Sequence, residues 1–440
     1  MLEVLQKAEK ILRENPAICD WCLGRFFGLK GSELSNNERG RAIKTLLFME
    51  AYQALPRRVD EVLLRCLAKS GYEPAREIVK KVFGEEIERL ACSVCGGLTE
   101  KYEMIARRLF EESRIYEFRT FEVGIRIPPD ILRREEDFWL RYSLSSAENL
   151  KNEASREIGK AFSRISGKEY SRINPELTII VDLATGNAEY VPAPLFIYGR
   201  YRKLVRGLPQ SPWSWPDERM RFNTSVEELI SKPAIETFKA EGAKLHAAGR
   251  EDIDVRTLGN GRPFVLELKR PKVRTVDLKD LQESINQRAR GLIEVIDLRY
   301  TDRKTLKKLK SLSSIARKKY LARVSFDEPL DDMKLQEISK IFDHAIISQR
   351  TPSRVLHRRA DRLRKKVVFS VNARKISQTE AEFIIDAQGG FYVKEFIHGD
   401  NGRTSPSISE YLGNRVKNIE LDVIEIEESF VDAYTSTLPG

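Results

Sequence analysis

Residues 246–270, HAAGREDIDVRTLGNGRPFVLELKR, decide the fold of the second half of this chain of 440 residues. Near the end of the stretch side chains alternate, so that Phe264, Leu266 and Leu268 fall on one face. Alternation with a period of two predicts a β-strand. Helical and strand patterns mix on both sides of it, and we therefore expect an α+β fold.

Two carboxylates precede this strand. Asp252 and Asp254 alternate with apolar residues, and Arg250, Arg256 and Arg262 flank them. A carboxylate among arginines can be a nucleophile, a base or half of a structural salt bridge, and the spacing alone leaves these alternatives open. Glycines at positions 249, 259 and 261 permit tight backbone near a ligand.

Two further patterns predict local structure in this half. Ser225 and Glu228 form a capping box that opens a helix. Gln388-Gly389-Gly390 stands between two β-rich runs and predicts a hairpin. On the second strand of that hairpin one face would carry Tyr392, Lys394, Phe396 and His398.

The first half divides into two regions. Residues 1–115 have mostly helical spacing, whereas residues 116–205 mix a strand, a Pro-Pro break, a helix and a hairpin turn at Thr185-Gly186-Asn187. The stretch GRYRKLVRGLPQSPWSWPDE, residues 199–218, is typical of an ordered linker with aromatic anchors. We therefore expect domains at 1–115, 116–205 and 206–440.

Four of the five cysteines form two pairs with two residues between the partners, and they lie in the N-terminal region. Such pairs in a reducing compartment favour a closed, structural zinc site over redox or merely buried thiols. Glycines 24, 96 and 97 suit tight turns beside them. The fifth, Cys66, lies in an apolar helical stretch and is expected in the core. The predicted zinc ligands are Cys19, Cys22, Cys92 and Cys95.

The net charge and the hydropathy of the chain limit the classes of partner that it is expected to bind. The net charge is +10, which suits a polyanion such as nucleic acid, because neutralised phosphates release counterions. No apolar run approaches the roughly 20 residues of a membrane helix, and the N-terminus lacks a signal-peptide pattern. We expect a cytoplasmic protein without membrane contact.

Several stretches together resemble one family. HAAGREDIDVRTLGNGRPFVLEL resembles the catalytic signature of archaeal and eukaryotic tRNA pseudouridine synthases that act on the T-loop, at tRNA uridines 54 and 55. The chain also resembles this family in its paired cysteine motifs, in a THUMP-type RNA-binding region, and in three further stretches. These are PLFIYGRYRKLVRGLPQSPW (194–213), QRTPSRVLHRRADRLR (349–364) and FYVKEFIHGDNGRTSPSISEYLG (391–413).

The resemblance implies a fold and a mechanism. A zinc-binding and THUMP-like α/β region would precede a pseudouridine synthase domain with a central mixed, mostly antiparallel sheet. The enzyme would flip the uridine out of the RNA, since a stacked base is out of reach. An aspartate then enables cleavage of the N-glycosidic bond, and the base rejoins the ribose through carbon 5. No organic cofactor is needed.

The family's Gly-Arg-x-Asp arrangement matches Gly249-Arg250-Glu251-Asp252, so the resemblance makes Asp252 the nucleophile, with Asp254 as the alternative. Arg250 would help to displace the base or hold phosphate, or else pair with Glu251 or another acid. The family also places aromatic rings on the flipped uracil. Further candidates for substrate contact are Tyr320 and Tyr392, each of which could instead be a core tyrosine, and Arg403, which could pair with the catalytic carboxylate.

Two basic runs are candidates for contact with RNA: the first is either a phosphate-facing surface or a solvated face, and the second is a stretch that the long arm of a tRNA could reach. The first comprises Arg354, Arg358, Arg359, Arg362, Arg364, Lys365 and Lys366. The second comprises Arg200, Arg202, Lys203 and Arg206, interleaved with Tyr198 and Tyr201. His246 and His398 lack an acid-rich metal pattern and are expected to be structural or to contact RNA.

Three functions fit these features. The chain is an enzyme that isomerises tRNA uridine, a non-catalytic tRNA-binding protein, or another tRNA-modifying enzyme with a THUMP region. The third would need a nucleotide or methyl-donor loop, and no such motif occurs. We therefore expect a pseudouridine synthase that binds the T-arm of tRNA as a monomer, without an obligate protein partner.

Overall fold

The computed structural model describes residues 2–31, 33–53, 58–213, 220–312, 315–357 and 359–427. The chain folds as two compact units that divide between Ala193 and Pro194. The division precedes the expected boundary at 205/206, because strand β7 (Leu195–Lys203) pairs with two strands of the second unit. Each unit is described by itself.

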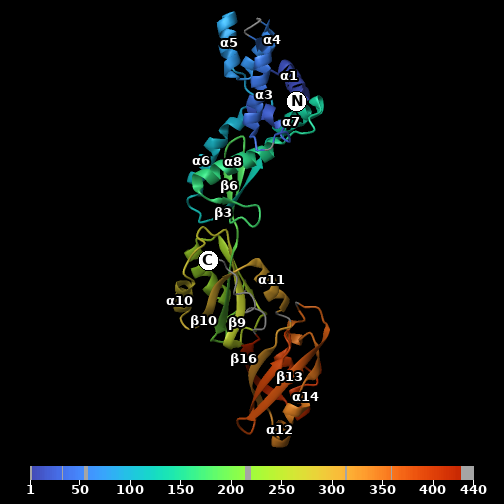
Figure 1. The fold of residues 1–440 in the computed structure, drawn as a ribbon. Helices are drawn as coiled ribbons and strands as arrows, with labels where there is room; N and C mark the ends of the chain where they lie inside the picture. The colour runs from blue at the N-terminus through green and yellow to red at the C-terminus, as the bar shows by residue number, and fades with distance from the viewer. Residues whose placement is uncertain are drawn as a thin grey trace. The chain divides into compact units, whose positions relative to one another are not determined.

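The first unit is built from helices around a small sheet (Figure 1). Its helices are α1 (Leu2–Glu14), α2 (Asp20–Arg25), α3 (Asn36–Ala51), α4 (Glu61–Lys69), α5 (Glu73–Phe83), the 3-10 turn η1 (Leu98–Lys101), α6 (Tyr102–Ser113), α7 (Pro129–Tyr142) and α8 (Leu150–Ser166). Its strands are β1 (Tyr52–Gln53), β2 (Arg58–Val59), β3 (Thr120–Arg126), β4 (Glu169–Tyr170), β5 (Leu177–Asp182) and β6 (Ala188–Pro192).

The sheet of the first unit has the order β4-β3-β5-β6, and only the β5–β6 pair is antiparallel. The turn predicted at Thr185-Gly186-Asn187 joins that pair, so the expected hairpin is confirmed. Helix α8 packs on β3 and on α6, and alternate residues of β3 and β5 are buried beneath it. The core runs continuously from these strands to the helices around the cysteines.

The second unit contains a large mixed sheet in the order β10-β7-β9-β16-β11-β14-β13-β12-β15, with β8 paired to β9. Its strands are β7, β8 (Gly242–Ala247), β9 (Arg256–Lys269), β10 (Ile293–Thr301), β11 (Lys318–Phe326), β12 (Ala345–Arg350), β13 (Leu363–Lys375), β14 (Glu380–Ala387), β15 (Thr404–Ser405) and β16 (Val416–Ile426). Its helices are α9 (Val226–Phe238), α10 (Leu278–Ala289), α11 (Arg303–Leu312), α12 (Asp332–Ile341), the 3-10 turn η2 (Ser353–Val355), α13 (Val393–His398) and α14 (Ile408–Leu412).

This sheet is antiparallel except where β16 runs parallel to β9, as the expected mixed, mostly antiparallel sheet requires. The close approach of these strands depends on Gly259, whose φ is 54°. A Cβ there would lie 1.7 Å from the carbonyl oxygen of Ile424. Gly259 therefore admits a neighbouring strand, whereas we expected it to make room for a ligand.

Local predictions around this sheet have mixed outcomes. Ser225 caps α9 as expected, and its hydroxyl accepts from the amide of Glu228. The hairpin predicted at Gln388-Gly389-Gly390 is wrong, because the chain turns into helix α13. Buried Val393, Phe396 and Ile397 follow helical spacing there, and tertiary packing outweighs their β-propensity.

Candidate functional site

A cavity of about 580 Å³ opens in the second unit beside β11 and β16. Its lining among the described residues comes from the loop from Gly249 to Val255, from β9, β11 and β16, and from parts of residues 354–366 and 390–394. The polar lining is strongly cationic, and Glu251 and Asp252 are its only acids among the described residues. A concave site with this charge suits an anionic ligand.

Asp252 lies in the cavity wall with its carboxylate about one-third exposed (32%). The Arg354 guanidinium donates to it at 3.0 Å, and the ammonium of Lys394 lies 3.8 Å away. The Nε of Arg354 in turn donates to the buried carboxylate of Glu395 at 2.7 Å. Asp252 is therefore held at the cavity by Arg354, and Glu395 in turn fixes the position of Arg354.

Asp254 has different surroundings. Lys394 contacts it at 2.7 Å, and Asp254 is not among the described residues that line the cavity. The geometry therefore favours Asp252 over Asp254 as the carboxylate that faces a ligand.

The loop that carries Asp252 is fixed through its backbone carbonyls. Lys203 donates to the carbonyls of Asp252 at 3.1 Å and Ile253 at 3.2 Å, and burial lowers the pKa of Lys203 to about 8. Arg206 donates to the carbonyl of Asp254 at 2.8 Å. Such bonds fix where a side chain points, because they leave the backbone few alternatives.

A buried ion pair supports the same loop. Glu251 forms an ion pair with Arg262 at 2.7 Å and accepts from the hydroxyl of Tyr201 at 3.0 Å, and all three residues are nearly inaccessible. Gln210 completes the group by donating to the Tyr201 hydroxyl and to the carbonyl of Gly249. Glu251 is thus committed to structure, and the alternative in which it pairs with Arg250 is wrong.

Both candidate tyrosines line the cavity. Tyr320 is buried on β11, and burial raises the pKa of its hydroxyl to about 12. Tyr392 is half-buried just before α13, and its hydroxyl accepts from Arg359 at 3.3 Å. An aromatic ring in a cavity wall offers a stacking surface for a base.

The two candidate arginines have separate positions. Arg250 lines the cavity and is exposed, and no ion pair or hydrogen bond joins it to another described residue. Arg403 donates to Asp361 at 2.7 Å and to the carbonyl of Thr351 at 2.9 Å. The prediction that Arg403 pairs with the carboxylate of Asp252 is therefore wrong, and Arg354 pairs with it instead.

The two basic runs differ in exposure. Of the first run, four members line the cavity, while Arg358 lies outside the described residues; the four are Arg354, Arg359, Arg364 and Lys366. In the second run Arg200 is 3% and Lys203 0% exposed, and both bind backbone carbonyls. Arg200 and Lys203 therefore serve structure and cannot meet the tRNA, whereas Arg202 and Arg206 remain partly exposed.

The two histidines form hydrogen bonds within the unit. His246 contacts Glu267 at 2.8 Å, and Nδ1 of His398 accepts from the amide of Asp400 at 3.0 Å. Both contacts fit structural roles.

The four paired cysteines of the first unit meet in space, with all sulfurs buried and within 4.8 Å of one another. The sulfurs of Cys19 and Cys95 are 3.7 Å apart, close to the roughly 3.8 Å that tetrahedral Zn–S bonds of about 2.3 Å require. Cys66 lies outside this group. The cluster can hold a metal ion, and the donor set suits a soft, tetrahedral one.

The glycines beside the cluster act in two ways. Gly96 and Gly97 have positive φ, as expected of tight turns. Gly24 lies within α2, where a Cβ would meet the carbonyl oxygen of Asn36 at 1.8 Å. Gly24 therefore allows α2 and α3 to cross closely, which differs from the expected turn.

Sequence reasoning did not single out three cavity residues: Lys318, Arg262 as a partner of Glu251, and Lys394 as a neighbour of Asp252. The available signal was the alternation in β11, because Lys318 stands two residues before Tyr320 and shares its buried face. Lys394 was missed as a neighbour of Asp252 because the residues after Gly390 were predicted to form a strand instead of helix α13.

Comparison with known proteins gives two family matches. Residues 196–427 match the model described as Pus10, C-terminal, and residues 105–182 match the Pus10 THUMP domain, archaeal. A protein of Thermofilum pendens named tRNA pseudouridine synthase Pus10 is 65% identical over 97% of this chain and 96% of its own length. Its namesake in Methanopyrus kandleri is 40% identical over 97% and 98%.

Solved structures are more distant. A Cbf5-Nop10-Gar1 complex matches 52% of this chain and 58% of its own with 17% identity and a TM-score of 0.28. A structure titled pseudouridylate synthase matches 54% and 66% with 13% identity and a TM-score of 0.23.

Proposed function

The chain belongs to the Pus10 family of tRNA pseudouridine synthases, and on this premise we propose that Asp252 is the carboxylate that opens the N-glycosidic bond of a flipped-out uridine. The protein is an isomerase that forms pseudouridine in tRNA, and the expected THUMP region is present. The position of Asp252 in the wall of the cationic cavity is the observation that carries the proposal.

The cavity suggests a role for each further residue. Asp252 acts on the ribose while Arg354 and Lys394 orient its carboxylate. Tyr320 and Tyr392 offer rings to the extruded base, and Arg250 is placed to hold phosphate. The base then turns and bonds to the ribose through carbon 5.

The tRNA should meet both units through its T-arm, with modification at uridine 54, uridine 55 or both. The THUMP region and the cationic cavity support this proposal. Zn²⁺ is the metal that best fits four buried thiolates, and it would serve structure because no ligand position stays open. We propose a cytoplasmic monomer without an obligate protein partner or organic cofactor. No helix among the described residues is long and apolar enough to cross a membrane.

The test uses unmodified tRNA tritiated at carbon 5 of uridine. Asp252→Ala should bind the tRNA and release no tritium, while Asp254→Ala retains turnover. If Asp254→Ala is inactive and Asp252→Ala is not, the assigned carboxylate is wrong. Mapping the product by chemical derivatisation and primer extension distinguishes position 54 from position 55.

A further inference from the structure

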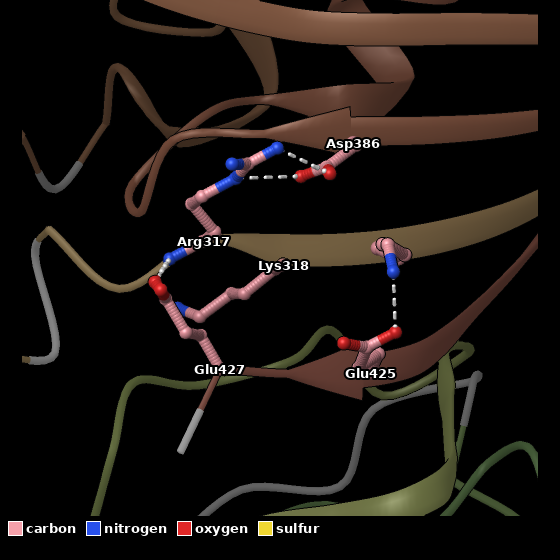
Figure 2. A pocket seen from close by; sticks show the side chains of 6 residues that line it. Arg317, Lys318, Asp386, Glu425 and Glu427 are labelled. Atoms are coloured by element: carbon pink, nitrogen blue, oxygen red, sulfur yellow. Dashed lines mark hydrogen bonds and ion pairs between the residues drawn. The ribbon is translucent and has the colours of Figure 1, made fainter. Parts of the chain in front are cut away.

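A second, smaller cavity of about 210 Å³ lies at the start of β11 in the same unit (Figure 2). Carboxylates of β14, of β16 and of Glu427 just after β16 face basic residues at and just before the start of β11 there. Arg317 reaches Asp386 at 2.7 Å, Lys319 reaches Glu425 at 2.7 Å, and Glu427 accepts from the amide of Arg317. A space of this size holds several water molecules.

Lys318 joins this small cavity to the reaction cavity. It is the one described residue that lines both, although its side chain is almost inaccessible at 6% exposure. Its Nζ lies over the backbone of the catalytic loop, 3.2 Å from where a Cβ of Gly249 would stand. Lys318 thus borders both cavities, with its side chain on the face of β11 that carries Tyr320.

The strand places Lys318 at the edge of the proposed base. Lys318 and Tyr320 project from the same face of β11, and two residues along a strand span about 6.6 Å. If the Tyr320 ring stacks on uracil, Lys318 lies beyond the ring at the periphery of the base, where carbon 5 carries its hydrogen.

We propose that Lys318 is the base that removes the proton from carbon 5 of the rejoined uracil and then releases it to solvent. This inference rests on the proposed function. When carbon 5 has bonded to the ribose, it still carries its hydrogen. The C5–H bond then breaks, its electron pair forms the C5–C6 double bond, and the former N1–C6 pair returns to N1. Nζ takes the proton from carbon 5, and N1 takes one from water, so the proton count is unchanged.

The charges around Lys318 fit this role. Arg262 from β9 and Lys366 from β13 oppose its positive charge, while Glu251 from the catalytic loop supports it. Burial, followed by Arg262, lowers the pKa of Lys318 to about 7, so a neutral amine is available near neutral pH. The other bases in the cavity are less suited. Asp252 is paired with Arg354 and is assigned to the ribose, Glu251 is held by Arg262, and Tyr320, with its raised pKa, keeps its proton.

The test compares tRNA carrying hydrogen or deuterium at carbon 5 of uridine, in single turnovers with excess enzyme. For the wild type acting on the deuterated tRNA, the rate should rise with pH through the neutral range and then level. Lys318→Arg keeps the charge but has no neutral form there. It should bind tRNA normally, react roughly 100-fold more slowly and show a large deuterium effect. Lys318→Gln should show the same slow reaction and deuterium effect, and it replaces Lys318→Arg in the test if the arginine variant does not fold.

Arg323→Gln is the matched control, because Arg323 is exposed on the opposite face of β11 and should react as the wild type. Wild-type rates in Lys318→Arg, or slow rates that are equal for the two isotopes, overturn the proposal. Wild-type rates would mean that Lys318 contributes only its positive charge. Equal slow rates for the two isotopes would mean that Lys318 acts in a step before the proton leaves carbon 5. A failure of Asp252 as the catalytic carboxylate is separate, because it appears in Asp252→Ala with undeuterated tRNA.

Discussion

The ammonium group of Lys203 donates to the backbone carbonyl of Asp252 at 3.1 Å, from a position with no exposed surface. The same group also holds the carbonyls of Leu208 and Ile253. A lysine at the end of β7 thus sets the position of the loop that carries Asp252.

Lys203→Met should reduce turnover while leaving tRNA affinity nearly unchanged. The change keeps the apolar volume but leaves buried carbonyls unpaired, and a misplaced catalytic group typically costs about 100-fold in rate. Single-turnover rates and filter binding measure the two effects. Exposed Lys244→Met on β8 is the control. A larger loss of affinity than of rate would contradict a positioning role.

Arg354→Ala should lower the rate of conversion by roughly 10- to 100-fold, because a hydrogen bond to a charged partner contributes about 1.5–3 kcal/mol. Arg354→Lys should recover part of it. The measurement is pseudouridine formed per enzyme under saturating tRNA. Arg374→Ala, an exposed arginine of β13 paired with Glu382, should match the wild type. Full activity in Arg354→Ala would contradict this prediction and would mean that Lys394 alone is enough to orient the carboxylate of Asp252.

Arg25 carries a prediction about the first unit. It is fully buried between Glu135 at 3.0 Å and Glu153 at 2.7 Å. Glu153→Ala should destabilise this unit by about 3–5 kcal/mol, because it leaves a buried charge poorly compensated. Urea unfolding measures the change. Glu73→Ala, which breaks an exposed ion pair, should cost at most about 1 kcal/mol. Equal midpoints for both variants would refute the prediction.

Metal removal should unfold the region around the cysteines. A strong chelator should release one Zn²⁺ per chain, expose four reactive thiols and lower the unfolding midpoint, because the metal binds only the folded arrangement. Cys95→Ser should do the same without chelator, whereas Cys66→Ser should retain the metal. A zinc indicator measures the release of metal, and thiol titration measures the exposure of the cysteines. Retention of metal by Cys95→Ser would exclude the four-cysteine site.

Stability should rise with pH above neutrality in the second unit. The folded state lowers the pKa of Lys203 to about 8 and that of Lys318 to about 7, from 10.5. Between about pH 7 and 10.5 the unfolded chain therefore binds more protons, and the free energy of unfolding increases with pH. Lys318→Met should flatten this rise. Denaturant midpoints at pH 7, 8 and 9 test it, and an unchanged slope in the variant would count against it.

The sequence predicted those features that depend on neighbouring residues. The alternation from Phe264 to Leu268 became β9, and the spacing of the cysteine pairs became one cluster. Asp252 was chosen by resemblance to Gly-Arg-x-Asp, and the cavity agrees with that choice without testing its chemistry.

What the sequence could not predict depends on long-range pairing. Arg403 and Arg354 both stand in basic, family-like stretches, and only the fold shows which of them reaches Asp252. The residues around Arg200 and Lys203 looked like a surface for RNA because their charge was visible and their burial was not. The segment after Gly390 resembled a strand by composition, whereas its packing against the core made it a helix.

Strand β16, which ends at Ile426, lies between β9 and β11 in the interior of the large sheet. On the ribosome, the sheet around Asp252 therefore stays open until this strand, the last among the described residues, emerges. Synthesis from Asp252 to Ile426 at about 5–20 residues per second leaves roughly 9–35 seconds in which a half-built reaction centre is exposed. Nascent chains should then need protection from aggregation, and a ribosome stalled before β16 would release an inactive product.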